Sequence, residues 1–237
     1  MYKVRICFSK TGYSKYVSHL DLMKTLQRTF RRGGIDISYS QGFNPHPIMS
    51  IAHPLPLGVE GFNEYMDIAV DTKPDYEVLK IKMNNALPND IRVHSVSEVT
   101  KPLNVLVRAE YTAIVNLKES VENLELLLKE FMERETVVVE KKTKRGINDT
   151  DIKPMIFSLE LIDVKNKEIT LKFVLANGEP ANLKAVTFLE AIEKYADGFK
   201  IDYYSIVREN LYDINMYKLN GWQIITTMLL LTKLILR

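Results

Sequence analysis

Residues 2–34 of the chain are YKVRICFSKTGYSKYVSHLDLMKTLQRTFRRGG. The first residues of this stretch alternate and are rich in Val, Ile and Phe, which predicts a strand. Ser18 is a favourable helix N-cap because Asp21 follows three residues later, and the pair Gly33-Gly34 is a favourable stop signal. The stretch therefore predicts a strand, a turn and a helix over residues 18–32.

The predicted helix is amphipathic. Its inner face carries apolar side chains, namely Met23, Leu26 and Phe30. Another face carries cations, namely Lys24, Arg28 and Arg31, followed by Arg32. This spacing predicts a helix with a basic outer stripe, and we expect Arg28, Arg31 and Arg32 to bind a partner there.

The next segments complete a first structural unit. We expect strands over residues 35–39, 65–70 and 91–99 and a helix over residues 75–86. The resulting order, β-α-β-β-α-β, is typical of the ferredoxin-like unit, an antiparallel sheet with two helices on one face. The fold class is therefore predicted to be α+β.

The second half of the chain repeats this order. The expected elements are a strand over 110–117, a helix over 119–132, a strand starting at 137–139, a hairpin of 156–162 and 169–175, a helix over 183–195 and a strand over 201–207. We predict two ferredoxin-like units in tandem, over residues 1–100 and 107–210, with a linker at 100–106 and a tail at 211–237.

Charge is distributed unevenly along the chain. The 237 residues have a net charge of only +2, which excludes a polybasic tail. The first 50 residues, however, hold eight Lys or Arg against two Asp, while residues 51–100 hold four against eight acidic residues. This asymmetry predicts one basic face and keeps a local RNA site open.

The single cysteine, Cys7, excludes a disulfide framework and a thiolate metal site. The N-terminus lacks the apolar core of a secretory signal, so we expect a cytoplasmic protein. The apolar run at 224–236 is shorter than the roughly 20 residues that a bilayer requires. We therefore expect a docking segment there and no membrane partner.

A stiff polar loop follows the basic helix. Residues 39–47, YSQGFNPHP, combine backbone-fixing Pro and Gly with polar side chains at Gln41, Asn44 and His46. Such a loop suits recognition of a ligand. Equally, it could be a structured connection whose polar groups satisfy its own backbone.

His19, in the first turn of the predicted helix, is a candidate general base, but a local hydrogen bond is the simpler interpretation of a lone histidine. His19, His46 and His53 lack the spacing of a metal-binding motif. Dinucleotide, P-loop, hydrolase and iron–sulfur motifs are absent from the sequence. We predict neither a metal nor a cofactor for this chain.

A second basic stretch lies at residues 141–146, KKTKRG. Lys144 and Arg145, next to a turn-forming glycine, could grip a phosphate group. The alternative is a solvated turn. If the two units pack side by side, this stretch and the basic helix could border one cleft.

Four motifs relate the chain to a known family. They are VSHLDLM at residues 17–23, RRGG at 31–34, YSQGFNPHP at 39–47 and PLPLGVE at 54–60. Over about residues 1–210 the sequence resembles the radical-SAM-linked protein family, bacterial proteins of unknown function encoded beside, or fused to, a cobalamin-binding-type radical SAM protein. The resemblance implies a partner enzyme that holds an iron–sulfur cluster. It carries over no catalytic residue and marks only the motif positions Ser18, His19, Asp21, Gln41, Asn44 and His46 as an expected site.

A second resemblance concerns architecture alone. Paired ferredoxin-like units with a basic helix are similar to the CRISPR repeat-processing endoribonucleases, which grip RNA between two such units. The chain lacks their glycine-rich loop near its end. Only the gripping of RNA is therefore implied.

Three hypotheses follow. The first is an accessory, non-catalytic subunit that binds a substrate, RNA, for a radical SAM partner. The second is a metal-independent ribonuclease with His19 or His46 as general acid or base. The third is a protein–protein adaptor that binds no nucleic acid. For the first two we expect the loop 40–47 and the start of helix 18–32 to lie together, with His19 and Asn44 within about 15 Å.

Overall fold

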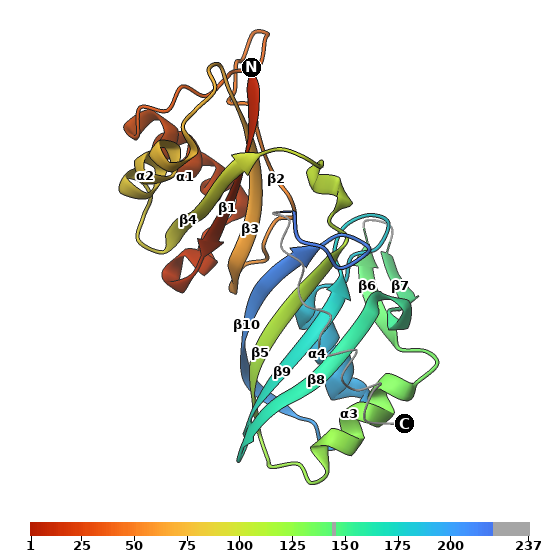
Figure 1. Cartoon of the computed structure of the whole chain (residues 1–237). Helices are drawn as coiled ribbons and strands as arrows, with labels where there is room; N and C mark the ends of the chain where they lie inside the picture. The colour runs from red at the N-terminus through yellow and green to blue at the C-terminus, as the bar shows by residue number, and fades with distance from the viewer. Residues whose placement is uncertain (144–145, 220–237) are drawn as a thin grey trace, which may run out of the picture.

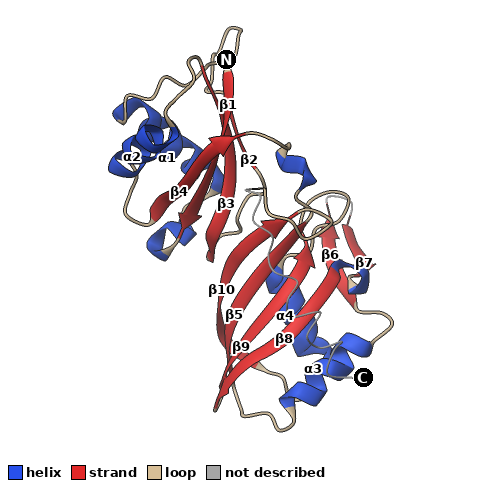
Figure 2. Cartoon of the chain, viewed as in Figure 1, coloured by secondary structure: helices blue, strands red, loops and turns tan. Residues whose placement is uncertain are grey.

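The structure is a computed structural model that describes residues 1–143 and 146–219. Its main feature is an eight-stranded sheet that runs through both halves of the chain, with helices packed against it (Figure 1). Figure 2 shows the strands of the two halves as upper and lower groups. The predicted α+β class is confirmed.

The first half has the element order β-α-β-β-α-β. Its elements are β1 (Tyr2–Lys10), α1 (His19–Arg32), β2 (Met49–Ile51), β3 (Val59–Val70), α2 (Tyr76–Ala86) and β4 (Ile91–Glu98), with a short 3-10 helix at Gly12–Tyr16. β1 pairs antiparallel with both β3 and β4, and β2 pairs antiparallel with β3. Helix α1 contributes Leu22, Leu26 and Phe30 to the core, where they meet Ile6 and Phe8 of β1.

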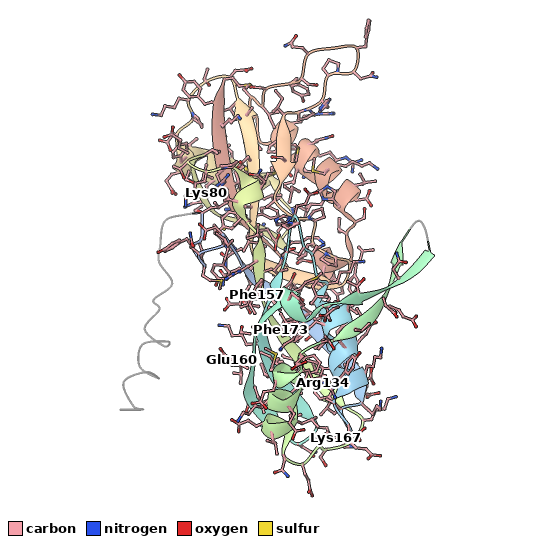
Figure 3. All side chains as sticks on the ribbon, turned by 90° about the vertical axis from the view of Figure 1, so that its right-hand side faces the viewer. Lys80, Arg134, Phe157, Glu160, Lys167 and Phe173 are labelled. Atoms are coloured by element: carbon pink, nitrogen blue, oxygen red, sulfur yellow. The ribbon has the colours of Figure 1, made fainter. Side chains whose placement is uncertain are left out.

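The second half repeats the order with one insertion. Its elements are β5 (Arg108–Leu117), α3 (Leu124–Glu133), β6 (Val138–Thr143), β7 (Gly146–Asp151), β8 (Ile156–Lys165), β9 (Glu168–Ala176), α4 (Ala185–Tyr195) and β10 (Ile201–Tyr212). Its part of the sheet has the order β10-β5-β9-β8, all antiparallel. The inserted β6–β7 hairpin forms a sheet of its own and projects away from the body (Figure 3).

The two sheets predicted from the sequence are in fact one. β10 pairs parallel with β3 over a short register, Ile206–Arg208 against Val59–Gly61. β2 pairs with β3 farther along the same edge, so β10 and β2 lie on one side of β3. Separate sheets are therefore the wrong expectation, and the interpretation of the halves as tandem ferredoxin-like units remains a prediction.

An aromatic cluster fills the core of the second half. The ring centroids of Tyr111 and Phe173 lie 5.5 Å apart, and those of Phe173 and Phe188 lie 4.7 Å apart. Phe131 of α3 meets Phe188 of α4 edge-on at 6.1 Å. Offset and edge-on pairs of this kind stabilise a core beyond their buried area. These contacts hold α3 and α4 against the sheet. Figure 3 labels Phe173, which belongs to β9 of that sheet.

Two predicted elements differ from the structure. Residues 35–39 form only isolated bridges, Ile37 to Val70 and Tyr39 to Pro47, because the neighbouring edge of β3 pairs with β2 instead. The helix expected from residue 119 begins at Leu124, because Asn123 adopts a left-handed conformation with a φ of 53°.

Two sequence expectations fall on residues outside the described ranges. These are the phosphate grip at Lys144 and Arg145 and the docking segment at residues 224–236. Among the residues that the structure does describe, no helix has both the length and the apolar character needed to cross a bilayer.

Candidate functional site

The start of α1 is a capped helix end. The Ser18 hydroxyl accepts a hydrogen bond from the Asp21 backbone N–H at 3.2 Å and donates one to Asp21 Oδ2 at 2.7 Å. The Ser18 hydrogen bond, followed by Lys24, lowers the pKa of the Asp21 carboxyl. The predicted cap is thus confirmed, and both side chains have a structural partner in each other.

Beside this helix end lies a small pocket with polar and apolar walls. It is lined by Phe8, Lys10, His19, Leu22, Ile51, Leu55 and Glu64. His19 is half-buried at the first residue of α1, whereas Lys10 and Glu64 are almost fully buried. The pocket therefore places a histidine, a lysine and a glutamate around one space.

Glu64 is bound to Arg208 of β10. Arg208 Nε donates to Glu64 Oε1 at 2.8 Å, and Nη2 donates to the His53 carbonyl at 2.7 Å. A second contact joins Nη2 to Glu64 Oε2 at 2.5 Å, so the ion pair is bidentate. Burial acts to lower the pKa of Arg208, but the charge and hydrogen bonds of Glu64 outweigh it and raise the pKa.

This ion pair connects the two halves of the sheet. Side chains two residues apart on a strand share a face, so Glu64 points the same way as Met66 and Ile68, which pack under α1 and α2. Arg208 lies directly opposite Tyr111, whose ring packs toward α4. The pair thus lies where the helix-covered faces of the halves meet.

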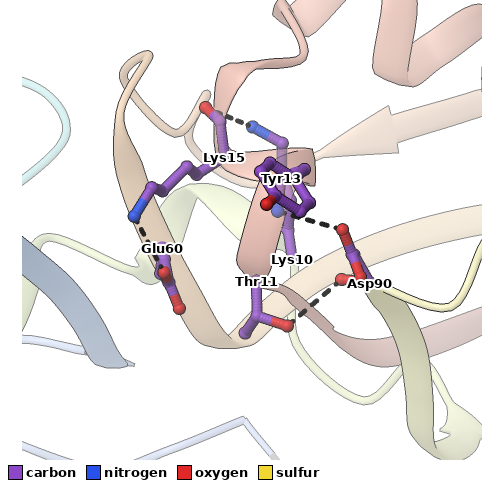
Figure 4. Close-up of polar contacts among 6 residues, drawn as sticks. All are labelled: Lys10, Thr11, Tyr13, Lys15, Glu60 and Asp90. Atoms are coloured by element: carbon purple, nitrogen blue, oxygen red, sulfur yellow. Dashed lines mark hydrogen bonds and ion pairs between the residues drawn. The ribbon is translucent and has the colours of Figure 1, made fainter.

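Lys10 has no comparable partner. The only hydrogen bond of its side chain in the described part of the chain goes to the Lys15 carbonyl at 3.4 Å, which is long (Figure 4). Burial lowers the pKa of Lys10, an effect that Glu64 opposes and Arg208 reinforces. Lys10 is 2% exposed, so the charge of its ammonium group lies in the protein interior with little to offset it.

Two of the eight cations of the first 50 residues form ion pairs with the acidic segment that follows. Arg5 Nε binds Asp67 Oδ1 at 2.7 Å, and Lys15 Nζ binds Glu60 Oε1 at 3.2 Å (Figure 4). The predicted binding residue Arg32 donates to the Ala86 carbonyl at the end of α2. Part of the charge asymmetry in the sequence is therefore compensated by contacts within the first half.

Arg28 and Arg31 are the exception on α1. Both are exposed, and neither side chain forms a direct hydrogen bond or ion pair within the described residues. Lys24 is also exposed and has only a loose contact of 3.4 Å with Asp21. The predicted basic stripe consequently consists of Lys24, Arg28 and Arg31, while Arg32 is turned toward α2.

The loop over residues 39–47 is closed by its own backbone. Tyr39 bridges Pro47, and Ser40 N–H donates to the His46 carbonyl at 2.9 Å. The His46 ring lies 2.9 Å from the Ser40 hydroxyl, while Gln41 and Asn44 are exposed. Phe43, at the tip, is fully exposed at 106%.

The predicted shared site is wrong. His19 lies beside Lys10, at the C-terminal end of β1, whereas the loop follows Ile37, which bridges Val70 opposite Tyr2 at the other end. The nine residues of β1 separate these ends by roughly 26 Å. Because α1 runs back along β1, its C-terminal end lies at the same end of the first half as the loop (Figure 1).

His53 has a structural role. Its Nε2 lies 2.8 Å from the Leu106 carbonyl, and burial lowers its pKa. It packs against Gly178, whose φ of +148° and close neighbours leave no room for a side chain. Within residues 1–143 and 146–219, no three His, Cys, Asp or Glu side chains are arranged to hold a metal ion.

Sequence reasoning missed Lys10, Glu64, Arg208 and Phe43 as residues of interest. Lys10 and Glu64 are charged residues in strands rich in apolar residues, and that was the available signal. Arg208 lies 144 residues from Glu64, so no local pattern could pair them. Phe43 was visible inside its motif, but its exposure depends on how the loop is closed.

The fold and the site define a class, an α+β protein whose two halves share one sheet and a buried ion pair. Residues 3–185 match the family model described as "Uncharacterized protein conserved in bacteria (DUF2344)". The chain belongs to this family. No curated protein matches the sequence significantly.

Three solved structures are similar in part. A Cbf5-Nop10-Gar1 complex matches with a TM-score of 0.47 at 9% identity, covering 88% of this chain and 48% of that one. The archaeal box H/ACA sRNP Nop10-Cbf5 complex has a TM-score of 0.45 at 10% identity, covering 87% and 47%. An H/ACA RNP bound to a substrate RNA containing 2′-deoxyuridine has a TM-score of 0.44 at 7% identity, with the same coverage. The chain spans about half the length of these proteins, and likenesses below a TM-score of 0.5 say nothing about what it binds.

Proposed function

We propose that the chain is an accessory RNA-binding protein that works with a cobalamin-type radical SAM partner enzyme. The observation that carries this proposal is the pair of exposed arginines, Arg28 and Arg31, on α1. Guanidinium groups without an internal partner are suited to phosphate groups. Their spacing of three residues places them on one face of α1.

The loop at the same end supplies a second element of such a surface. Phe43 offers a fully exposed ring, and Gln41 and Asn44 offer exposed amide groups. Single-stranded RNA binds surfaces that combine cations for the backbone with aromatic rings on which bases stack. We infer that unpaired RNA, whose bases are free to stack, is the preferred form.

The partnership rests on the family resemblance of the motifs at residues 17–23, 31–34 and 39–47. A radical SAM partner has to supply the iron–sulfur cluster, since this chain has one cysteine. That cysteine, Cys7, is buried, and burial raises the pKa of its thiol to about 12. The division of labour is then RNA on this chain and redox chemistry on the partner.

A filter-binding titration over a range of salt concentrations tests the RNA proposal. Three phosphate contacts, from Lys24, Arg28 and Arg31, give a log–log slope of about −2.1 for a single strand, at about −0.7 per contact. The double substitution Arg28→Ala/Arg31→Ala should flatten the slope by about 1.4. The matched control is Lys118→Ala/Lys200→Ala, which removes two exposed cations from the second half and should leave the slope unchanged.

Two outcomes would contradict the proposal that this surface binds RNA. If no RNA binds at low salt, or if both double variants behave alike, the basic stripe is a docking surface for an acidic protein instead. The ribonuclease alternative is tested with the same labelled RNA, because cleavage would shorten it. His19 and His46 lie at opposite ends of the first half, so the two cannot serve as acid and base on one phosphodiester bond.

A further inference from the structure

We propose that Lys10, His19 and the first turn of α1 form a binding pocket for an oxyanion group, a phosphate or a carboxylate. This pocket is distinct from the RNA surface proposed above, because it lies at the other end of β1. The lining residues come from β1, α1, β2, β3 and the loop before β3. The pocket is therefore a built feature of the fold.

The charge balance of the interior supports an anion. Glu64 uses both carboxylate oxygens on Arg208, which makes that pair neutral as a unit. Lys10 adds a further positive charge beside it, and no carboxylate of the described residues lies within ion-pairing distance of its ammonium. A buried ammonium without a carboxylate partner is costly, so the site favours a ligand that brings a negative charge.

The donors around the pocket point to an oxyanion. The Lys10 ammonium carries three N–H donors, of which one has a long contact to the Lys15 carbonyl. The imidazole of His19 supplies another donor at the rim. The backbone N–H of His19 belongs to the first turn of a 14-residue helix, where the helix dipole also favours an anion.

The dimensions limit what enters. The free volume of the pocket is about 10 Å³, close to what one water molecule requires, so it has room for one oxygen atom. Phe8, Leu22 and Ile51 form the apolar walls around it. The rest of the ligand has to extend past His19 toward solvent. A terminal phosphate or carboxylate group on a larger molecule satisfies both conditions.

Two acidic groups near the pocket do not compete for this role. Glu64 is committed to Arg208, as described above. Asp21 is exposed and is held by the Ser18 hydroxyl and Lys24. The net charge of the groups around the pocket, between β1 and α1, therefore stays positive.

The test uses the full chain with inorganic phosphate and, in a separate arm, acetate, each replacing chloride at constant ionic strength. Binding is followed by the melting temperature and by the ring signals of the four histidines in NMR spectra. We expect one of the two anions to raise the melting temperature and to shift the His19 signals while the exposed His94 stays unchanged. The anion that acts identifies the source of the oxyanion group.

Lys10→Met is the decisive variant. It keeps the shape of the side chain and removes the buried charge, so the melting temperature without anion should stay equal or rise, and the anion dissociation constant should increase about tenfold or more. His19→Gln should weaken binding less, and His94→Gln should not affect it. RNA binding should be unaffected by Lys10→Met, so failure here and failure of the RNA proposal are distinguishable.

Three results would overturn the proposal. One is the absence of any response to either anion at tens of millimolar. Another is a response that Lys10→Met leaves intact. The third is a Lys10→Met protein that is strongly destabilised, since that would show Lys10 to be a structural partner of Glu64 and not an empty anion site.

Discussion

The two ends of β1 use charge in opposite ways. At the Lys10 end, Lys10, Glu64 and Arg208 are each at most 2% exposed, and their charges interact within the protein. At the Tyr2 end, the side chains of Arg28 and Arg31 of α1 and the ring of Phe43 are exposed, and none of the described residues forms a side-chain hydrogen bond or ion pair with the two arginines. Buried charges fix the joint between the two halves, whereas exposed ones are available to a ligand. A sequence excess of positive charge therefore does not by itself mark a binding surface.

The largest expected effect comes from breaking the buried ion pair. Glu64→Gln leaves the Arg208 guanidinium buried without its counter-charge, and we expect the free energy of unfolding to fall by about 3–5 kcal/mol. Urea denaturation measures this loss. Glu60→Gln, which breaks the more accessible Lys15–Glu60 pair, is the matched control and should cost about 1 kcal/mol or less. Equal losses in the two variants would contradict a special role for the buried pair.

A substitution at the Tyr2 end of β1 should change RNA binding and leave the stability of the protein unchanged. Phe43→Ala removes a ring that contacts solvent only, so the free energy of unfolding should stay unchanged within error. If one RNA base stacks on this ring, the substitution should weaken RNA binding by about 1–3 kcal/mol. Phe157→Ala is the control, because its ring on β8 is also partly exposed but lies against Arg108 in the second half. A loss of RNA affinity in both variants would argue against a site at the loop.

Sequence patterns predicted local features of this molecule well and distant ones poorly. Ser18 and the glycines after Arg32 mark the ends of α1 because capping is decided within a few residues. The parallel contact of β10 with β3 joins residues almost 150 positions apart, and no periodicity encodes such a contact. The prediction that His19 and Asn44 share a site was wrong for the same reason. Motif proximity along the chain suggested that His19 and Asn44 share a site, but α1 carries the chain to the far end of β1 between them.

Cys7, midway along β1, provides a pH-dependent comparison. Burial, followed by the charge of Glu64, raises the pKa of its thiol from 9.0 in a model peptide to about 12. Because the folded pKa is the higher one, the stabilising contribution is complete below about pH 9 and is lost as the pH rises toward 12. The loss amounts to at most about 1.4 kcal/mol per pH unit.

The measurement is urea denaturation of the natural protein and of Cys7→Ala at pH 8 and at higher pH. The difference between the two proteins should shift in favour of Cys7→Ala as the pH rises, because the variant has no thiol to ionise. In the native state, a thiol reagent should react with Cys7 only as fast as the protein opens. A rapid native reaction would show that the middle of β1 is accessible.

The smallest expected effect concerns the cap of α1, which adjoins the Lys10 end. Ser18→Ala removes the acceptor for the Asp21 N–H, and we expect the free energy of unfolding to fall by about 1 kcal/mol. Ser18→Asp restores a capping oxygen and should recover that stability, but its carboxylate adds a negative charge beside the pocket. The dissociation constant of the oxyanion should therefore increase in Ser18→Asp even though the fold is intact. Ser205→Ala, an exposed serine on β10, is the control for removing a hydroxyl and should change neither quantity. Tighter oxyanion binding by Ser18→Asp would mean that the anion does not approach α1 from its first turn.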